Sequence, residues 1–341
     1  MKRRLPAEWE AQDGVLITWP HQKSDWAPVI DRVEPVFIEI AASISMSEKV
    51  IITVPERDSL EERLSDAGAQ MDNVYVFYLE SNDTWARDFG PITVYEVTRP
   101  VILDFGFNGW GLKFPAFHDN QVTRRLHRAG AFGGTVIEMP GLILEGGSID
   151  SDGEGTVLTT AECLLHVNRN PHLTKDEIEQ RFFRLMGVQR VLWLNHGYMA
   201  GDDTDSHIDT LARFCPGDAI AYVCCEEKGD EHYEALKTME DDLRGFTTAE
   251  GKPYRLLPLP MPSPVFDENG DRLPATYANF LIINNAVLVP VYNDKNDEKA
   301  LEILSQAFIG RKIIAICCSP LLLQHGSLHC ITMQLPQGVL L

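Results

Sequence analysis

The feature that most constrains the fold of this 341-residue chain is the recurrence of one helix with two or three short strands. Segments in which apolar residues recur with helical spacing begin at residues 56, 118, 174, 231 and 298. These starts are separated by roughly sixty residues, and a near-regular recurrence of this length indicates stacked modules rather than one doubly wound sheet.

Periodicity predicts that helices alternate with short strands along the chain. The helices are predicted at Pro28–Ser47, Glu56–Ala67, His118–Arg128, Thr174–Met186, Glu231–Arg244 and Glu298–Phe308. The strands, most of them rich in Val and Ile, are predicted at Val15–Trp19, Val50–Val54, Val74–Tyr78, Ile92–Val97, Val101–Phe105, Thr135–Met139, Thr156–Thr159, Arg190–Leu194, Ala219–Val223, Tyr254–Leu259, Phe280–Ile283, Ala286–Val291 and Lys312–Ile316. The chain is therefore predicted to be α/β throughout.

No motif divides the chain or places it in a common nucleotide-binding fold. It has no G-x-G-x-x-G after an early strand, no Walker A motif and no G-x-S-x-G elbow. Pro, Asp, Asn and Gly cluster in Pro262–Ala275, which is predicted to be a loop. Because there is neither a low-complexity segment nor a linker, residues 1–341 are predicted to form a single domain.

The charge balance bears on the class of partner. Thirty Lys and Arg residues against fifty Asp and Glu residues give a formal net charge of −20, which argues against a nucleic-acid partner because a phosphate backbone would be repelled. A cationic small molecule is compatible with this acidity, because a negatively lined cleft would concentrate it. The alternative is that the acidic residues only keep the protein soluble.

Neither a signal peptide nor a membrane segment is expected. Pro, Glu and Trp follow the basic start, and no apolar run reaches the roughly 18 residues that a membrane-spanning helix needs. The seven cysteines include two vicinal pairs but no C-x-x-C, a pattern that favours reduced thiols and a cytoplasmic location. A homo-oligomer is compatible with the sequence, which does not specify the oligomeric state.

Two segments early in the chain concentrate unusual residues in loop-like settings. In Asn82–Pro91, Trp85, Arg87 and Asp88 precede Gly-Pro, although a turn with an Arg–Asp pair is the structural alternative. In Leu144–Asp150, Glu145 precedes two glycines, where backbone can come close to a ligand, although a strand bulge would explain the same pattern.

Two later segments carry histidine and cysteine. In Gly201–Asp209, an extended backbone would place His207 and Asp209 on one face, and the aspartates are expected to raise the pKa of His207. This acid-rich string lacks the EF-hand register of a calcium loop. In Gln324–Thr332, Cys330 has polar surroundings, whereas the other cysteines are typical of buried core thiols.

A cysteine and a histidine together indicate nucleophilic catalysis. The surplus of carboxylates indicates the electrophile, because a planar guanidinium offers N–H donors and a positive charge that carboxylates match in bidentate fashion.

These segments resemble the agmatine deiminase and bacterial-type peptidylarginine deiminase family, and the resemblance covers essentially the whole chain. The matching stretches are Pro6–Glu10, Thr18–His21, Trp85–Pro91, Glu145–Ser148, Asn168–His172, His207–Asp209 and His329–Gln334. The resemblance implies the pentein fold, a five-bladed α/β propeller of ββαβ-type modules with pseudo-fivefold symmetry.

The resemblance also implies the roles of single residues. Cys330 matches the nucleophile, His207 the general acid/base, Asp88 and Asp209 the carboxylates that hold the guanidinium, and Glu145 the supporting acid. The bound cation and His207 are expected to favour the Cys330 thiolate. Further substrate contacts are expected from Trp85, Arg87, Trp110, Gly146 and Asp203. Neither a metal ion nor an organic cofactor is expected.

The implied reaction is hydrolytic deimination through a covalent amidino-thioether, with agmatine converted to N-carbamoylputrescine and ammonia in putrescine biosynthesis. The loop Phe107–Phe114 departs from the Trp-Gly-Gly pattern of agmatine-specific members at Leu112 and Lys113, and Asp150 has no assigned role. Peptidyl or free arginine is the alternative substrate. Rival functions are an amidinotransferase, a papain-like protease, a metal-dependent hydrolase and a catalytically inactive guanidinium-binding propeller.

Overall fold

The computed structural model describes residues 3–56 and 59–340, and its strands form five small sheets. Each sheet contains the same unit, in which a first strand pairs antiparallel with a second strand and the second pairs parallel with a third. A helix connects the second strand to the third, as a parallel crossover requires. This repeated ββαβ unit confirms the predicted pentein architecture.

The members of the five units are as follows. The first strands are β17 (Thr332–Pro336), β5 (Ile92–Glu96), β8 (Ile149–Ser151), β11 (Ala212–Cys215) and β14 (Leu281–Ile282). The second strands are β2 (Gln12–Thr18), β6 (Arg99–Leu103), β9 (Thr156–Thr160), β12 (Ala219–Cys224) and β15 (Ala286–Val291). The crossover helices are α1 (Ile30–Ser45), α5 (Val122–Arg128), α7 (Lys175–Met186), α8 (Tyr233–Gly245) and α9 (Asp297–Ala307). The third strands are β3 (Lys49–Val54), β7 (Val136–Glu138), β10 (Arg190–Leu194), β13 (Arg255–Pro260) and β16 (Lys312–Cys317).

Other elements extend or connect the units. They are β1 (Arg3–Arg4), β4 (Val74–Tyr78), α2 (Leu60–Asp66), α3 (Ala86–Phe89), α4 (Gly109–Leu112), α6 (Ala161–Leu164) and the 3-10 helices η1 (Ala27–Val29), η2 (Met71–Asn73), η3 (Asp119–Gln121), η4 (Gly146–Ser148), η5 (Ile208–Thr210) and η6 (Leu321–Gln324). The segment predicted as the loop Pro262–Ala275 contains neither a helix nor a named strand.

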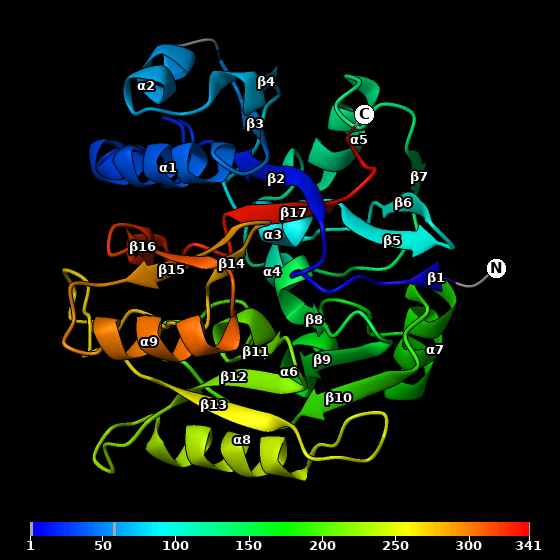
Figure 1. Ribbon diagram of the computed structural model, residues 1–341, viewed down its shortest axis with the longest axis vertical. Helices are drawn as coiled ribbons and strands as arrows, with labels where there is room; N and C mark the ends of the chain where they lie inside the picture. The colour runs from blue at the N-terminus through cyan, green and yellow to red at the C-terminus, as the bar shows by residue number, and fades with distance from the viewer. Residues whose placement is uncertain (1–2, 57–58, 341) are drawn as a thin grey trace.

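The two ends of the chain close the arrangement. β17, near the C-terminus, is the first strand of the sheet whose second strand, β2, lies near the N-terminus. Figure 1 shows the crossover helices α1, α7, α8 and α9 at the periphery and the short strands β8, β11 and β14 nearer the middle. The loops that leave the short inner strands therefore meet around a common centre.

The recurrence in the sequence needs one correction. The predicted helix Glu56–Ala67 corresponds to α2, and its residues 57 and 58 lie outside the described residues. α2 and β4 extend the first sheet, so the crossover helix of that unit is α1. The interval in the first unit is longer than the others because of this insertion.

Helix α7 illustrates why these sequences form helices at these places. The Thr174 hydroxyl accepts a hydrogen bond from the backbone N–H of Glu177, whose carboxylate accepts from the Thr174 backbone N–H, and Gly187 ends the helix in the left-handed conformation. Ile178, Phe182 and Met186, spaced four residues apart, are buried. Burial of each such side chain contributes about 1.5–3 kcal/mol, so this stripe holds the helix against its sheet.

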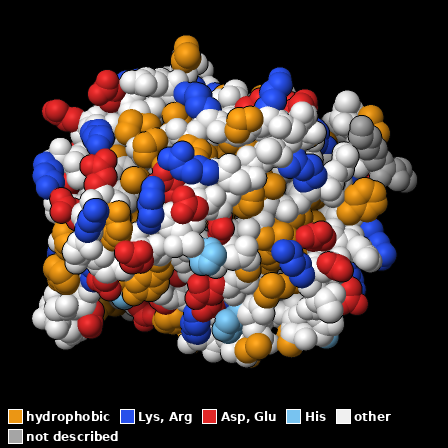
Figure 2. All heavy atoms as spheres, turned by 90° about the horizontal axis from the view of Figure 1, so that it is seen from below, with side chains coloured by type: hydrophobic (Ala, Val, Ile, Leu, Met, Phe, Trp, Pro, Cys, Tyr) orange, Lys and Arg blue, Asp and Glu red, His pale blue; other side chains and the backbone are white. Residues whose placement is uncertain are grey.

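Two surface observations bear on partners. No helix among the described residues is long and apolar enough to cross a membrane. On the face shown in Figure 2, Lys and Arg side chains are interspersed with Asp and Glu side chains, so that face offers no continuous basic track to a phosphate backbone.

Candidate active site

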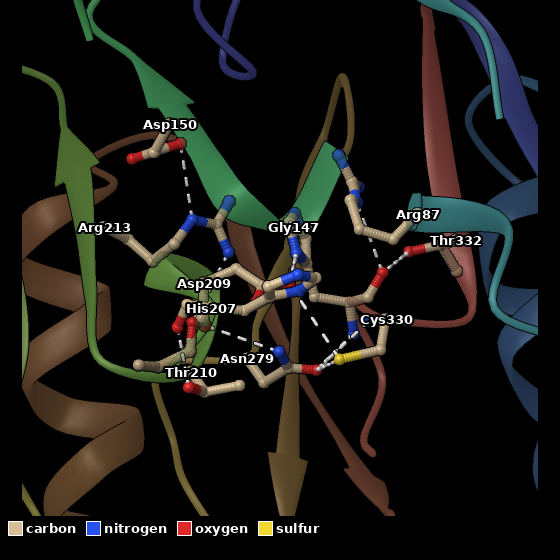
Figure 3. A network of polar contacts seen from close by, with 12 residues as sticks. Arg87, Gly147, Asp150, His207, Asp209, Thr210, Arg213, Asn279, Cys330 and Thr332 are labelled. Carbon is tan, nitrogen blue, oxygen red and sulfur yellow. Dashed lines mark hydrogen bonds and ion pairs between the residues drawn. The ribbon is translucent and has the colours of Figure 1, made fainter. Parts of the chain in front are cut away.

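The four segments singled out in the sequence meet at the common centre of the five units. Asp88 lies on α3, Glu145 directly precedes η4, His207 and Asp209 lie at η5, and Cys330 lies just before β17. α3 contacts η4, and η4 contacts η5. Figure 3 shows the side chains of His207 and Asp209, which lie at η5, close to that of Cys330, which comes from the segment before β17.

A cavity of about 180 Å³ opens from this centre toward solvent. Its buried end is formed by Cys330, His207 and Asp88, and its outer part by side chains that include Asp202, Asp203 and Phe114. The complete lining is Asp25, Asp83, Trp85, Asp88, Trp110, Phe114, Asp202, Asp203, Thr204, His207, Thr210, Gln324, His325, Gly326 and Cys330. Of the expected substrate contacts, Trp85, Trp110 and Asp203 line this cavity.

The thiol of Cys330 faces acceptors and negative charge. Its Sγ lies 3.4 Å from Asn279 Oδ1 and 3.9 Å from Asp209 Oδ2, and the side chain is 8% exposed. Burial, with the negative charges of Asp209 and Asp88 adding to it, raises the pKa of Cys330 well above its usual value. In the empty site the cysteine is therefore a thiol, and a bound cation is needed to favour the thiolate.

His207 departs from the sequence-based expectation. The aspartates were expected to raise its pKa, but burial lowers the pKa of His207 to about 3 despite the charge of Asp209. The ring is 1% exposed, and its Nδ1 lies 3.5 Å from Asp88 Oδ1. The imidazole is therefore neutral in the empty site and is poised to accept a proton rather than to stabilise a thiolate by its charge.

The two aspartates have opposite environments. Asp88 accepts hydrogen bonds from the Gly147 backbone N–H at 3.0 Å and from Trp110 Nε1 at 2.8 Å, but burial and the nearby Asp209 raise its pKa well above its usual value. Burial acts to raise the pKa of Asp209, but the hydrogen bond with His329, together with the positive charges of His329 and Arg213, outweighs burial and leaves the pKa lowered. Asp209 lies directly behind the cavity wall, and its Oδ1 is buried without a partner among the described residues.

Glu145 is held by an arginine. Arg169 Nε donates to both carboxylate oxygens of Glu145, at 2.9 and 3.0 Å. Arg169 Nη1 donates to Asp205 Oδ2 at 2.6 Å. Burial raises the pKa of Glu145. Ligand atoms of Glu145, Cys163 and His207 lie within 4.8 Å of one another, a spacing that could hold a metal ion. Because the guanidinium of Arg169 already occupies the carboxylate, this cluster does not fit a metal site.

Two expected substrate contacts are placed elsewhere, and these assignments are corrected. Arg87 points away from the cavity, and its guanidinium contacts Gln334 Oε1 and the carbonyl oxygen of His329. The guanidinium lies on the side of Glu8 because the buried carboxylate of Glu8 attracts it, with Arg87 Nη1 4.0 Å from Glu8 Oε2. Gly146 packs against the Arg87 backbone, whereas a Cβ on Gly147 would lie 2.6 Å from His207 Nδ1. Gly147 is thus the glycine that allows the close approach.

The positions left open by the sequence also find their places. Asp150 lies 3.4 Å from Arg213 Nε and accepts from the Phe214 backbone N–H, so it is a buried partner of Arg213. Lys113 Nζ donates to Asp205 Oδ1 at 2.7 Å and to the Asp203 carbonyl at 2.6 Å. Leu112 is 72% exposed. Lys113 therefore ties the loop that carries Trp110 to the acidic loop opposite.

Residues that the sequence reasoning did not single out complete the site. Asn279 Oδ1 accepts the backbone N–H groups of His329 and Cys330, at 2.9 and 3.2 Å. His329 bridges Asp209 and Glu8. Asn279 follows an unremarkable Tyr-Ala, so no local pattern marked it, but His329 and Glu8 lie within stretches already matched to the family.

The five repeated units, with a thiol and paired carboxylates presented at their centre, place the chain among pentein-fold enzymes that act on guanidinium groups. The model of the Porphyromonas-type peptidyl-arginine deiminase family matches residues 4–336. The chain belongs to this family, whose members are hydrolases of the C–N bonds of amidines, and the family resemblance read from the sequence is confirmed.

Relatives cover nearly the whole chain. A protein of Marinomonas sp. (strain MWYL1), provisionally named agmatine deiminase, is 35% identical over 356 residues, which cover 98% of this chain and 94% of that protein. The crystal structure of a provisionally named arginine deiminase from Porphyromonas gingivalis is 49% identical, with a TM-score of 0.95 and complete coverage of both chains. The C. jejuni agmatine deiminase with substrate bound is 40% identical, with a TM-score of 0.91, covering 99% of this chain and 97% of that one.

Proposed function

We propose that this protein hydrolyses agmatine to N-carbamoylputrescine and ammonia. The observation that carries the proposal is the charge of the cavity, because the described residues that line it include Asp25, Asp83, Asp88, Asp202 and Asp203 but neither lysine nor arginine. A substrate with a cation at each end and no carboxylate is the best match for such a lining.

The two ends of the cavity divide the recognition. Asp88 and Asp209, at the buried end, match the guanidinium, and Asp202 and Asp203, in the outer part, match the primary amine. Free arginine would bring an α-carboxylate into the same acidic surroundings without a cationic partner, which costs binding free energy. Peptidyl-arginine would place a neutral amide there and would gain nothing from the outer acids.

The first half of the reaction uses the neutral histidine as a base. When the guanidinium binds, its charge offsets Asp88 and Asp209, and the thiol of Cys330 passes its proton to His207. The thiolate attacks the guanidinium carbon and forms a tetrahedral adduct. The His207 imidazolium then donates this proton to one amino group of the adduct, which leaves as ammonia. A cationic amidino-thioether remains on Cys330.

The second half is hydrolysis of that intermediate. His207, neutral again, accepts a proton from water as the hydroxide adds to the amidino carbon. The adduct collapses with loss of the Cys330 thiolate, which takes the proton back from His207. The hydroxyl group of the released product loses its proton to solvent, where the released ammonia takes it up as ammonium, and the neutral ureido product remains. The net change is guanidinium plus water to urea group plus ammonium. The shape and charge of the cavity supply the orientation, an effect that can reach about 7–11 kcal/mol.

Several wider assignments belong to the same proposal. The cysteines of the chain are free, which supports a cytoplasmic enzyme, where a role in putrescine biosynthesis is proposed from the product. Pairing of β17 with β2 joins the two ends of the chain in one sheet and supports a single domain over residues 1–341. A homo-oligomer stays a prediction.

Peptidyl-arginine is kept as the second candidate because of the apolar surface beside the cavity. Leu112 and Phe117 are 72% and 63% exposed, and Phe114 lines the cavity itself. Exposed apolar side chains of this kind can contact the flanking residues of a peptide.

A substrate panel tests the proposal. Agmatine, free arginine, an arginine blocked at both ends and a peptide with C-terminal arginine are compared by the formation of the ureido group, without any added amine. We expect kcat/KM for agmatine to exceed each arginine compound by at least about 100-fold, as for a charged partner left unpaired. Equal turnover of blocked arginine and agmatine would overturn the substrate assignment, and ammonia release only with an added amine would indicate an amidinotransferase.

A further inference from the structure

We propose that Glu8 and His329 are positioning residues that hold Asp209 ionised and oriented beside the nucleophile. The inference deepens the proposed function, since it concerns the same site. Glu8 comes from the segment before β2, whereas His329 directly precedes Cys330, so the two ends of the chain are joined behind the reacting cysteine.

The geometry forms a continuous line of hydrogen bonds. His329 Nδ1 lies 2.8 Å from Asp209 Oδ2, and His329 Nε2 lies 2.8 Å from Glu8 Oε2. All three side chains are buried, with exposures of 1 to 5%. An ionised carboxylate can only accept, so when Asp209 and Glu8 are both ionised the imidazole between them donates from both nitrogens.

Glu8 is itself anchored at its far side. Arg213 Nη2 donates to Glu8 Oε2 at 2.6 Å, and the Ile282 backbone N–H donates to Oε1 at 2.8 Å. Glu8 therefore stays ionised and cannot turn away from His329. The imidazole is fixed in turn, and it holds only one oxygen of Asp209.

The consequence is felt at the reacting end. Asp209 Oδ2 is engaged by His329 and lies 3.9 Å from Cys330 Sγ, whereas Oδ1 has no hydrogen-bond partner among the described residues and is left for a guanidinium. Other groups also act on Asp209, and the test must account for them. The charged or titratable groups around it are Cys330, His207, Asp88, Arg213, Arg87 and His329.

A purely structural role is the alternative, because Glu8 also neutralises the buried Arg213. The chain offers a matched control for this role. Asp150 is the second carboxylate beside Arg213, and among the described residues its hydrogen bonds and ion pairs involve neither Asp209 nor His329. D150N therefore removes a buried carboxylate beside Arg213 and leaves the hydrogen bonds between Glu8, His329 and Asp209 in place.

The experiment compares two alkylating agents that react with Cys330. Chloroacetamidine is cationic and depends on the negative charge of the site, whereas iodoacetamide is neutral, so the ratio of their rates reports the charge at Asp209 whichever substrate the enzyme uses. We expect H329Q, which keeps the Glu8–Arg213 pair, to lower this ratio about tenfold at pH 7, as for loss of a charge-assisted hydrogen bond. E8Q should act in the same direction.

The variants are also compared by the pH dependence of kcat/KM on whichever substrate of the panel the unchanged protein hydrolyses. The acid limb should move to higher pH in H329Q and stay in place in D150N, with thermal unfolding measured for each. An unchanged labelling ratio in H329Q, or an equal fall in D150N, would overturn the proposal. If agmatine is not a substrate, the proposed function fails while the labelling ratio still decides this inference.

Discussion

The buried end and the outer part of the cavity are built on different principles. At the buried end, Asp88, His207 and Cys330 are nearly inaccessible. Gly147 and Trp110 donate hydrogen bonds that hold Asp88, and Asn279 accepts one from the thiol of Cys330. The outer part is formed by loops with left-handed non-glycine residues, which are Trp110, Leu112, Asp205, Ser206 and His325. Strain of this kind persists only where the surroundings enforce it.

This difference separates chemistry from selectivity. The groups of the buried end are held by elements of several units at once, so a small displacement there should affect turnover. The outer loops depend on a few contacts such as that of Lys113, so changes there should affect binding of the substrate tail. Substitutions at the two ends of the cavity should therefore differ in whether they change kcat or KM.

The largest effect is expected for C330A. Removal of the thiol abolishes the covalent route, so ureido formation should fall by at least about 10⁴-fold, as for loss of other catalytic nucleophiles. C317A, at a half-buried cysteine outside the cavity, is the matched control and should keep nearly full activity. Retained turnover in C330A would show that the cysteine is not the nucleophile.

The close approach of the Gly147 backbone to His207 and Asp88 should matter for turnover nearly as much as the thiol. In G147A, the new Cβ would lie 2.6 Å from His207 Nδ1 and 2.7 Å from Asp88 Oδ1, so both groups must move. We expect kcat to fall about 100-fold, as for an ångström-scale misplacement of a catalytic group. G229A meets nothing within 4 Å and serves as the control. Equal kinetics for the two variants would contradict the tight fit of the buried end.

Asp203 should control the pH dependence of agmatine binding. Burial, with the neighbouring Asp202 adding to it, raises the pKa of Asp203 to about 6. Because the carboxylate takes up a proton as the pH falls through 6, it loses its charge, and KM for agmatine should rise between pH 7 and 5. D203N should raise KM about tenfold at pH 7 and should weaken this pH dependence, with little change in kcat. A fall in kcat alone would place Asp203 in the chemistry instead.

The smallest effect is expected for the tie between the two outer loops. K113M removes the ion pair with Asp205, which is partly exposed and therefore contributes roughly 1 kcal/mol or less. KM for agmatine should rise only a few-fold, with kcat preserved. K295M, at a lysine outside the cavity lining, is the control. A loss comparable to that of G147A would mean that the outer loops also set the chemistry.

Whether a strand could be predicted from the sequence depends on its length and on how apolar it is. The second strands, such as β12 and β15, are buried on both faces and appear in the sequence as continuous apolar runs. The first strands β8, β11 and β17 were missed because they are only three to five residues long and include polar residues such as Asp150, Arg213 and Gln334. The site lies at the ends of these inner strands, so the least predictable elements carry the chemistry.

The reacting residue types and the family could be inferred without the structure. The residues assigned to the chemistry lie in local motifs, which can be recognised without knowing what packs against them. They are Cys330, His207, Asp88 and Asp209. The same stretches contained Glu8 and His329, but nothing local indicated that they face each other across 321 positions.

The protonation and orientation of those residues, by contrast, depend on how the chain packs around them. Counting nearby aspartates predicted a raised pKa for His207, whereas burial lowers it, and Arg87 turned out to face Glu8 rather than the cavity. The physical reason is the same for both. The cost of burying a charge depends on every atom that excludes water from it, and those atoms come from segments far apart in the sequence.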